Sequence, residues 1–244
     1  MKFISKIKNP SSKSNTPLQT KIQENLKEIK CIIFDCDGVL VDSEEIGTGV
    51  LLSMAKEFGL RMTLEEAMMN FSGRSLKDCL NEIENRTGQK LPEDFTDVFR
   101  KKTFEKYESE LQPVKGVKEF IESLTISFCV ASSGPMDKIR SNLSITGLAE
   151  KFGDNVFSSY LINSWKPDPE IFLHAAKEMG FSPKECIVIE DSKAGVISAK
   201  RGGFTVYALA NENNSQILQT EGAIIFYRFE ELDILLNSEK NTGS

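Results

Sequence analysis

The sequence is poor in the residue types that zinc and triad chemistry use. Its 244 residues include a single histidine, His174, and five cysteines without a Cys-x-x-Cys pair. One histidine excludes a His-Glu-x-x-His zinc site and supplies a Ser-His-Asp triad poorly. His174 lies in a helical pattern, where we expect it to pack or face solvent. The odd, scattered cysteines argue against a disulfide framework and favour a reducing compartment, so we expect a cytoplasmic protein.

Long apolar runs and a basic excess are also missing. No apolar stretch reaches the ~18 residues of a transmembrane helix, so we expect no membrane partner. The net charge is −6; the first thirty residues hold seven lysines against two glutamates, +5, which leaves −11 on the rest. An acidic body argues against a nucleic-acid partner. It is compatible with a small anionic substrate, because a bound metal and a few cations reverse the field locally. We expect a monomer.

The chain divides into a tail and an alternating region. Residues 1–30 are rich in lysine and serine and read as a loosely ordered basic tail, not a secretory signal. Beyond them, strands alternate with helices, which indicates a parallel sheet covered on both faces. We therefore predict an α/β fold with a doubly wound, Rossmann-like parallel sheet. Its strands are predicted at CIIF (31–34), ISFCVA (126–131), VFSSY (156–160), CIVI (186–189), FTVYAL (204–209) and AIIFYR (223–228).

One helical stretch interrupts the alternation directly after the first strand. Residues 44–112 read as helices separated by glycine or proline. We predict that they form an all-helical cap domain inserted into an α/β core made of 31–43 and 113–244. Its apolar side chains are expected to face its own core; they include Met68, Met69, Phe95 and Phe99.

Polar residues follow three of the predicted strands. Ligands of an open parallel sheet bind at the carboxyl ends of its strands, so these side chains should meet at one edge. Crowded carboxylates repel unless one is protonated or a cation is bound, and oxygen ligands without histidine or cysteine suit Mg²⁺. The residues are Asp35 and Asp37, Ser132 and Ser133, and Glu190 and Asp191.

The segment FDCDGVLVDSE (34–44) suggests phosphoryl transfer. Asp35 and Asp37 are two residues apart, so both can face one pocket while Cys36 points away. Gly38 allows a sharp turn after them. The first aspartate would attack phosphorus to form an aspartyl phosphate. The second would give a proton to the leaving oxygen and later take one from water.

Four segments in order resemble the motifs of haloacid dehalogenase-like hydrolases. They are FDCDGVLVDSE, VASSGP (130–135), SWKPDPEIF (164–172) and IEDSKAGVISAKRGG (189–203). The resemblance is strongest to the branch with β-phosphoglucomutase, phosphoglycolate phosphatase and bacterial 6-phosphogluconate phosphatase, and WKPDP with VASSGP is most similar to the last. It implies that Asp35 is the nucleophile and Asp37 the acid/base. Ser132 and the Ser133 amide would then contact the phosphoryl group, and Lys166 would hold that group and the nucleophile.

The resemblance also implies a Mg²⁺ cofactor. Asp191 would bind the metal together with Asp35, with Glu190 helping directly or through water, and the Asp37 backbone carbonyl would complete the shell. From the residues alone, a metal, a lysine and hydroxyl or amide donors supply most of what phosphoryl transfer requires.

Local patterns suggest how these residues are held. Asp168 and Pro169 read as the cap and first residue of a helix after Lys166. Ser192 reads as the cap of the helix after Asp191, and Gly195 as a site of close approach.

We therefore expect a Mg²⁺-dependent phosphatase of small phosphorylated metabolites, sugar or sugar-acid phosphates. The alternatives are a β-phosphoglucomutase-type mutase and a non-hydrolytic module that only accepts a phosphoryl group. The helical insert and Asp37 argue against the last. The mutases this chain resembles place a histidine in the first cap helix, which residues 44–59 lack. Arg74 and Lys77 are candidate substrate contacts in the cap, although solvent-facing charges explain them equally well.

Overall fold

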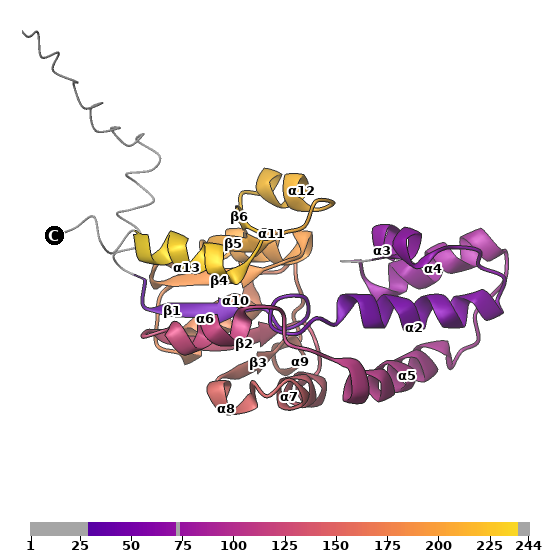
Figure 1. The fold of residues 1–244 in the computed structure, drawn as a ribbon, viewed down its shortest axis with the longest axis horizontal. Helices are drawn as coiled ribbons and strands as arrows, with labels where there is room; N and C mark the ends of the chain where they lie inside the picture. Colours follow the sequence, from indigo (N-terminus) through magenta and orange to yellow (C-terminus); the bar gives the residue numbers. More distant parts are fainter. Residues whose placement is uncertain (1–28, 72–73, 239–244) are drawn as a thin grey trace, which may run out of the picture.

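A six-stranded, fully parallel sheet forms the centre of the protein. The computed structural model describes residues 29–71 and 74–238 (Figure 1). The strand order is β3-β2-β1-β4-β5-β6. Strands β2 and β3 lie on one side of β1, and β4, β5 and β6 lie on the other. This confirms the predicted doubly wound sheet. The strands are β1 (Cys31–Phe34), β2 (Ser127–Ser132), β3 (Val156–Ser158), β4 (Cys186–Glu190), β5 (Thr205–Leu209) and β6 (Ile224–Phe226).

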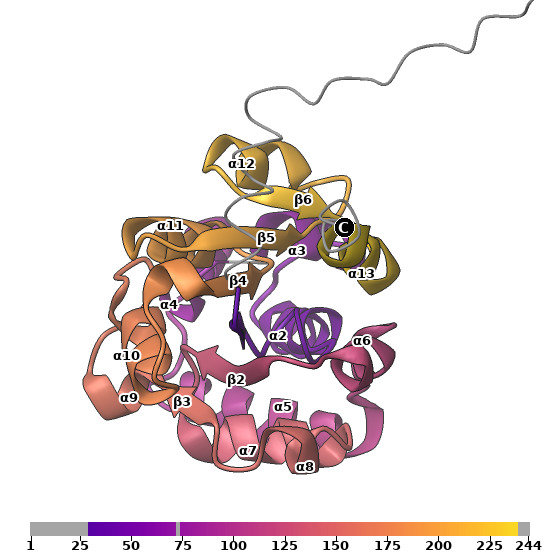
Figure 2. The same cartoon turned by 90° about the vertical axis from the view of Figure 1, so that its left-hand side faces the viewer.

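Both faces of the sheet are buried under helices, as its continuous apolar strands require. Alternate residues of β1 point to opposite faces: Ile32 and Phe34 belong to one apolar cluster, Cys31 and Ile33 to the other. The first face is covered by α6 (Val117–Ser123), α7 (Met136–Ile145), α8 (Ala149–Phe152) and α13 (Phe229–Ser238). The second is covered by α10 (Glu170–Glu178), α11 (Lys193–Arg201) and α12 (Ser215–Thr220). Figure 2 shows α10 and α11 on one side and α6 and α13 on the other.

Four helices between β1 and β2 build a separate apolar cluster. They lie beyond the carboxyl end of β1 in Figure 1, and a cap of this kind was expected. Their hydrophobic centre includes Leu51, Ile83 and Phe95, with Phe99 packed against it. They are α2 (Glu44–Glu57), α3 (Leu64–Phe71), α4 (Leu76–Thr87) and α5 (Phe95–Glu110).

The prediction that Met69 faces the cap core is wrong. Its side chain is 60% exposed, whereas Ala67 and Phe71 of the same helix are buried. A position two residues away from both of these points to the opposite side of a helix. Met68 is partly buried.

Two strands extend one residue further than their apolar runs. β2 ends at Ser132 and β4 at Glu190, so these polar side chains are placed by the sheet itself. Short helices α9 (Ser159–Ile162) and η1 (Pro183–Glu185) complete the described chain. The predicted basic tail lies, up to residue 28, outside the described residues. Within residues 29–71 and 74–238, no helix is long and apolar enough to cross a membrane.

Candidate active site

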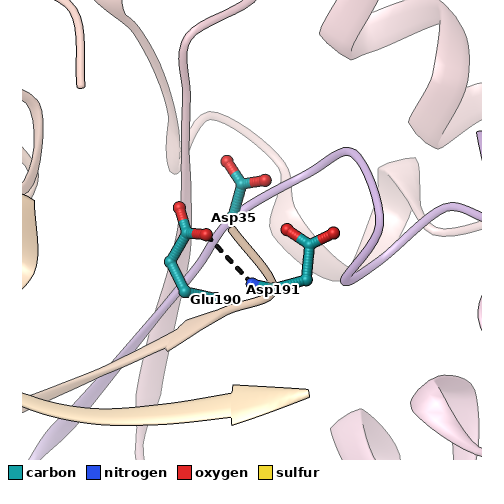
Figure 3. A group of neighbouring side chains, drawn as sticks. All are labelled: Asp35, Glu190 and Asp191. Carbon is teal, nitrogen blue, oxygen red and sulfur yellow. Dashed lines mark hydrogen bonds between the residues drawn. The ribbon is translucent and has the colours of Figure 1, made fainter. Parts of the chain in front are cut away.

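Three carboxylates converge where β1 and β4 end. Asp35 directly follows β1, Glu190 is the last residue of β4 and Asp191 comes next. One oxygen from each lies within 4.8 Å of the others (Figure 3). β1 and β4 are neighbours at the point where the strand order reverses, where open α/β sheets bind ligands. The strand-end pattern in the sequence therefore located this cluster.

Lys166 forms ion pairs with two of these carboxylates, those of Asp35 and Glu190. Its ammonium group bonds the carboxylate of Asp35 and Oε1 of Glu190, the latter at 2.6 Å. Its side chain is only 6% exposed and its Nζ lies 4.8 Å from the ring centre of Phe172. Burial opposes the charged form, but the two carboxylates outweigh it and raise the pKa of Lys166. The lysine therefore stays charged and compensates one of the three negative charges.

The loop that carries Lys166 is fastened by α11. Ser198 Oγ donates to the Asp168 carbonyl at 2.6 Å, and Arg201 donates to the Pro167 carbonyl at 3.2 Å. Helix α10 begins at Glu170, with Pro169 as its N-cap and no side-chain cap. The predicted capping role of Asp168 is thus wrong: α11 holds this turn, through contacts distant in sequence.

Glu190 is completely buried and fully bonded. Its Oε2 accepts from the backbone N–H groups of Asp191 (2.9 Å) and Ser192 (3.0 Å) and from Ser192 Oγ (3.0 Å). Ser192 also caps α11 by accepting from Gly195 N, which confirms the predicted cap. A Cβ built on Gly195 would lie 1.8 Å from Glu190 Oε1, which confirms the predicted close approach. Glu190 is therefore held in one position by bonds to both of its carboxylate oxygens.

Asp191, by contrast, has an uncompensated carboxylate. Among the described residues, no side chain forms a hydrogen bond or ion pair with its carboxylate oxygens. Burial and the neighbouring carboxylates of Glu190 and Asp35 raise the pKa of Asp191 well above its ordinary value. Burial, assisted by Glu190 and opposed by Lys166, raises the pKa of Asp35 to about 7. The carboxylates of Asp35 and Asp191 repel each other when both are ionised. Their oxygens form a donor set that fits a hard divalent cation, which would remove this repulsion.

Gly38 lies so close to the carboxylate of Asp191 that no side chain fits at position 38. Its φ of +79° lies in the left-handed region, and a Cβ there would come within 2.0 Å of Asp191 Oδ2. The turn after Asp37 therefore requires glycine for two independent reasons.

The carboxylate of Asp37 binds a different lysine. Lys138 Nζ of α7 donates to Oδ2 at 2.8 Å, and Ser43 Oγ donates to Oδ1 at 2.9 Å. Burial alone would raise the pKa of Asp37, but Lys138 and Ser43 hold it below the ordinary value. Asp37 therefore lies beside the three-carboxylate cluster, and its side chain is not part of that cluster. Lys138 belongs to none of the four motifs, so nothing in the sequence marked it as a site residue.

The segment after β2 forms one wall of the site. Ser132 is buried, and its Oγ accepts from Gly134 N at 3.1 Å. Ser158 Oγ, at the end of β3, donates to the Gly134 carbonyl at 2.6 Å. This bond holds the turn after β2 in place. Ser133 lines the adjoining cavity.

A cavity of about 870 Å³ extends from Asp37 into the helical cap. Core residues such as Ser133 and Lys138 form one wall, and cap residues form the other. Arg74 lies on the cap wall, where it donates to the Asn70 carbonyl at 2.9 Å. Lys77 is exposed on α4 and is not among the described residues that line the cavity. Arg100, which the sequence analysis did not single out, also lines it.

The fold and the acidic pocket define an α/β protein with a covered polar site at the sheet's switch point. The model of the haloacid dehalogenase-like hydrolase family matches residues 32–209, and the chain belongs to this family. The expectation of a hydrolase of this family is thereby confirmed.

Two characterised relatives and one solved structure are similar over most of the chain. The 6-phosphogluconate phosphatase of Escherichia coli (strain K12) is 33% identical over 195 residues, covering 79% of this chain and 88% of the relative. The phosphorylated carbohydrates phosphatase of Thermotoga maritima is 28% identical over 218 residues, covering 84% and 96%. A conserved haloacid dehalogenase-like protein of unknown function from Agrobacterium tumefaciens superposes with a TM-score of 0.80 at 29% identity, covering 87% and 100%.

Proposed function

We propose that this protein is a Mg²⁺-dependent phosphatase that hydrolyses small phosphorylated sugars or sugar acids through an aspartyl phosphate on Asp35. The observation that carries the proposal is the division of the two aspartates. Asp35 is a member of the three-carboxylate cluster and binds Lys166, whereas Asp37 lies outside that cluster and lines the cavity. A nucleophile and an acid/base group with different surroundings are what two-step phosphoryl transfer needs. The relatives named as phosphatases of 6-phosphogluconate and of phosphorylated carbohydrates support the substrate class.

In the first step a carboxylate oxygen of Asp35 attacks phosphorus. The new bond joins phosphorus to this oxygen while the bond from phosphorus to the ester oxygen breaks. The electron pair of the broken bond stays on the leaving oxygen, which takes a proton from Asp37 and departs as an alcohol. Because Lys138 and Ser43 keep the pKa of Asp37 low in the free protein, that proton first comes to Asp37 from the phosphate monoanion of the substrate. Lys166 and the donors of Ser132 and the Ser133 amide stabilise the negative charge on the phosphoryl oxygens.

In the second step water attacks the same phosphorus. Asp37, now a carboxylate, takes a proton from the water as the oxygen–phosphorus bond forms. The bond between phosphorus and Asp35 breaks, so inorganic phosphate leaves and the carboxylate of Asp35 is restored. Asp37 again holds a proton, and the loss of that proton restores the free protein, so the cycle is balanced.

The residues fit a magnesium ion. Asp35, Asp191 and the backbone carbonyl of Asp37 would hold it, with Glu190 acting through water because both of its oxygens already have donors. When bound, magnesium would supply charge neutralisation between the nucleophile and the phosphoryl oxygens. Lys166 offsets only part of the negative charge of the three carboxylates. The remaining negative charge would be neutralised by a divalent cation.

Hydrolysis is favoured over sugar-phosphate isomerisation by the first cap helix. Helix α2 contains no histidine, and the single histidine of the chain, His174, lies on α10 in the core. We propose a small metabolite as the substrate, a monomer as the active form and the cytoplasm as the location. Residues 44–112 would then move as the cap over a core of 31–43 and 113–244.

The decisive experiment measures phosphate release from 6-phosphogluconate and p-nitrophenyl phosphate, with magnesium and with chelator. We expect magnesium-dependent release by the wild-type protein. Asp35→Asn should lower turnover by several orders of magnitude while the protein stays folded, because it removes the attacking charge and keeps the shape. Near-normal hydrolysis by this variant would refute the mechanism. Conversion of β-glucose 1-phosphate to glucose 6-phosphate without free phosphate would establish the mutase instead.

A further inference from the structure

Asp37 belongs to a closed ring of four contacts, two of which it makes itself. Lys138 Nζ binds its Oδ2 at 2.8 Å and Ser43 Oγ binds its Oδ1 at 2.9 Å. The same ammonium group lies 5.9 Å from the ring centre of Tyr107, on α5 of the cap. The Tyr107 hydroxyl donates to the Ser43 carbonyl at 3.4 Å, which closes the ring of contacts. Lys138 and Ser43 therefore each contact both Asp37 and Tyr107 of the cap helix, and Lys138 is the one that carries a positive charge.

Lys138 is close in sequence to the turn of Ser132 and Ser133, the proposed phosphoryl-binding wall. It lies near the start of α7, directly after the turn of Ser132, Ser133 and Gly134. Asn142, one turn further along α7, is fully buried and its Nδ2 lies 3.5 Å from Asp37 Oδ1. Residues four apart share one face of a helix, so α7 presents both groups to Asp37. One rigid element thus sets the place of both the phosphoryl wall and the acid/base carboxylate.

Two lysines share the acidic residues of the site between them. Lys166 binds Asp35 and Glu190, and Lys138 binds Asp37. Because Lys166 already has two carboxylate partners, Lys138 is the ammonium group that holds Asp37 on the cavity wall.

We propose that Lys138 is a positioning residue that keeps the carboxyl group of Asp37 directed at the leaving oxygen of the substrate. This inference rests on the phosphatase function proposed above. Its side chain is 35% exposed and lines the cavity, so replacing it leaves the apolar core intact. Because the lysine acts through Asp37, its loss must appear in the step that protonates the leaving group.

The test compares two aryl phosphates of similar shape. p-Nitrophenolate is a weak base that leaves without a proton, whereas phenolate is a stronger base that benefits from general-acid catalysis. The quantity to measure is kcat/KM, which reports the steps up to departure of the alcohol and not the later hydrolysis. In Lys138→Met, the ratio of kcat/KM for p-nitrophenyl phosphate to that for phenyl phosphate should rise about tenfold or more, since general-acid catalysis contributes roughly 10²–10⁴-fold.

Two controls separate positioning from a general effect on the fold. Lys138→Arg keeps a donor and a positive charge, so it should bring the ratio back toward the wild-type value. Lys151→Met removes a lysine whose ion pair with Glu122 lies on the surface, 3.1 Å long, and should leave the ratio unchanged. An equal loss on both substrates in Lys138→Met, or a failure of arginine to restore the ratio, would overturn the assignment.

Asp35→Asn, measured beside these variants, distinguishes the two proposals. Loss of turnover in that variant supports the phosphatase mechanism. An unchanged ratio in Lys138→Met would then overturn only the role of Lys138.

Discussion

Gly195 and Glu190 are packed so closely that no side chain fits between them. The ideal Cβ position on Gly195 lies 1.8 Å from Glu190 Oε1 and 1.9 Å from its carboxyl carbon. Glu190 is buried and bonded at both oxygens. Any shift of its carboxylate would break its bond to Lys166 or its bonds to the backbone of the turn after β4. The first turn of α11 therefore fixes the floor of the acidic pocket.

Gly195→Ala should disable the enzyme without unfolding it. The methyl group would displace Glu190 and with it Lys166, and a misplacement of about 1 Å near the chemistry can cost roughly 100-fold in rate. Gly49→Ala is the matched control, because nothing lies within 4 Å of its Cβ position on α2. That variant should keep full activity and melt slightly higher, since alanine is favoured over glycine in helices by up to ~1 kcal/mol. Full activity in Gly195→Ala would contradict the packing described here.

Removal of the metal should abolish turnover. We expect chelator to stop phosphate release and magnesium to restore it, with calcium a poor substitute because its larger, more flexible shell disturbs the in-line geometry. Asp191→Asn should raise the magnesium concentration needed for half-maximal activity. A magnesium titration of both proteins checks this. Full activity of the wild type in chelator would exclude the metal from the reaction.

The stability of the metal-free protein should fall as the pH rises from 5 to 8. The pKa of Asp35 is raised to about 7 by burial, and that of Asp191 is also raised, so the folded protein holds these protons more tightly than the unfolded chain. Stability is therefore lost as the pH rises from the ordinary carboxyl range through the raised values. The lowered pKa of Asp37 has the opposite sign but acts at more acidic pH.

Melting temperatures in chelator and in magnesium at the two pH values measure this effect. Magnesium should raise the melting temperature more at pH 8 than at pH 5, where protons compete for the same oxygens. Asp35→Asn should flatten the pH dependence in chelator. A metal-free melting temperature that rises between pH 5 and 8 would contradict the prediction.

The cap cavity provides a prediction about substrate recognition. Arg74 lines the cavity and Lys77 does not, although both belong to the same short segment. Arg74→Ala should raise KM for an anionic sugar-acid phosphate by about tenfold, the value of one charge-assisted contact, and affect p-nitrophenyl phosphate less. Lys77→Ala serves as the control and should change neither. Equal effects of Arg74→Ala on both substrates would show that this arginine does not contact the leaving group.

The sheet and the acidic cluster were predictable because each depends on local sequence. Cys31–Phe34 is continuously apolar because β1 is buried on both faces, and the polar residues follow directly where such strands end. In the same way, Ser192 and Gly195 could be interpreted because caps and close approaches involve neighbours a few residues away.

The partners of these residues were not predictable, since they come from distant parts of the chain. Lys138 meets Asp37 across 101 residues, and nothing in the helical pattern of α7 marks that lysine. Ser198 contacts the turn after Lys166 across 30 residues. The orientation of Met69 was missed because the helix is short and presents only one narrow face to its neighbours.

The attachment of the Lys166 turn to α11 has a consequence for mutational screens. Ser198 Oγ donates to the Asp168 carbonyl, and Ser198 belongs to α11, the helix that begins two residues after Asp191. A survey of random variants would thus find inactivating changes at Ser198, even though no reactant ever touches it. Substitutions there would damage both ends of the pocket at once, because a single helix anchors the lysine on one side and the carboxylates on the other.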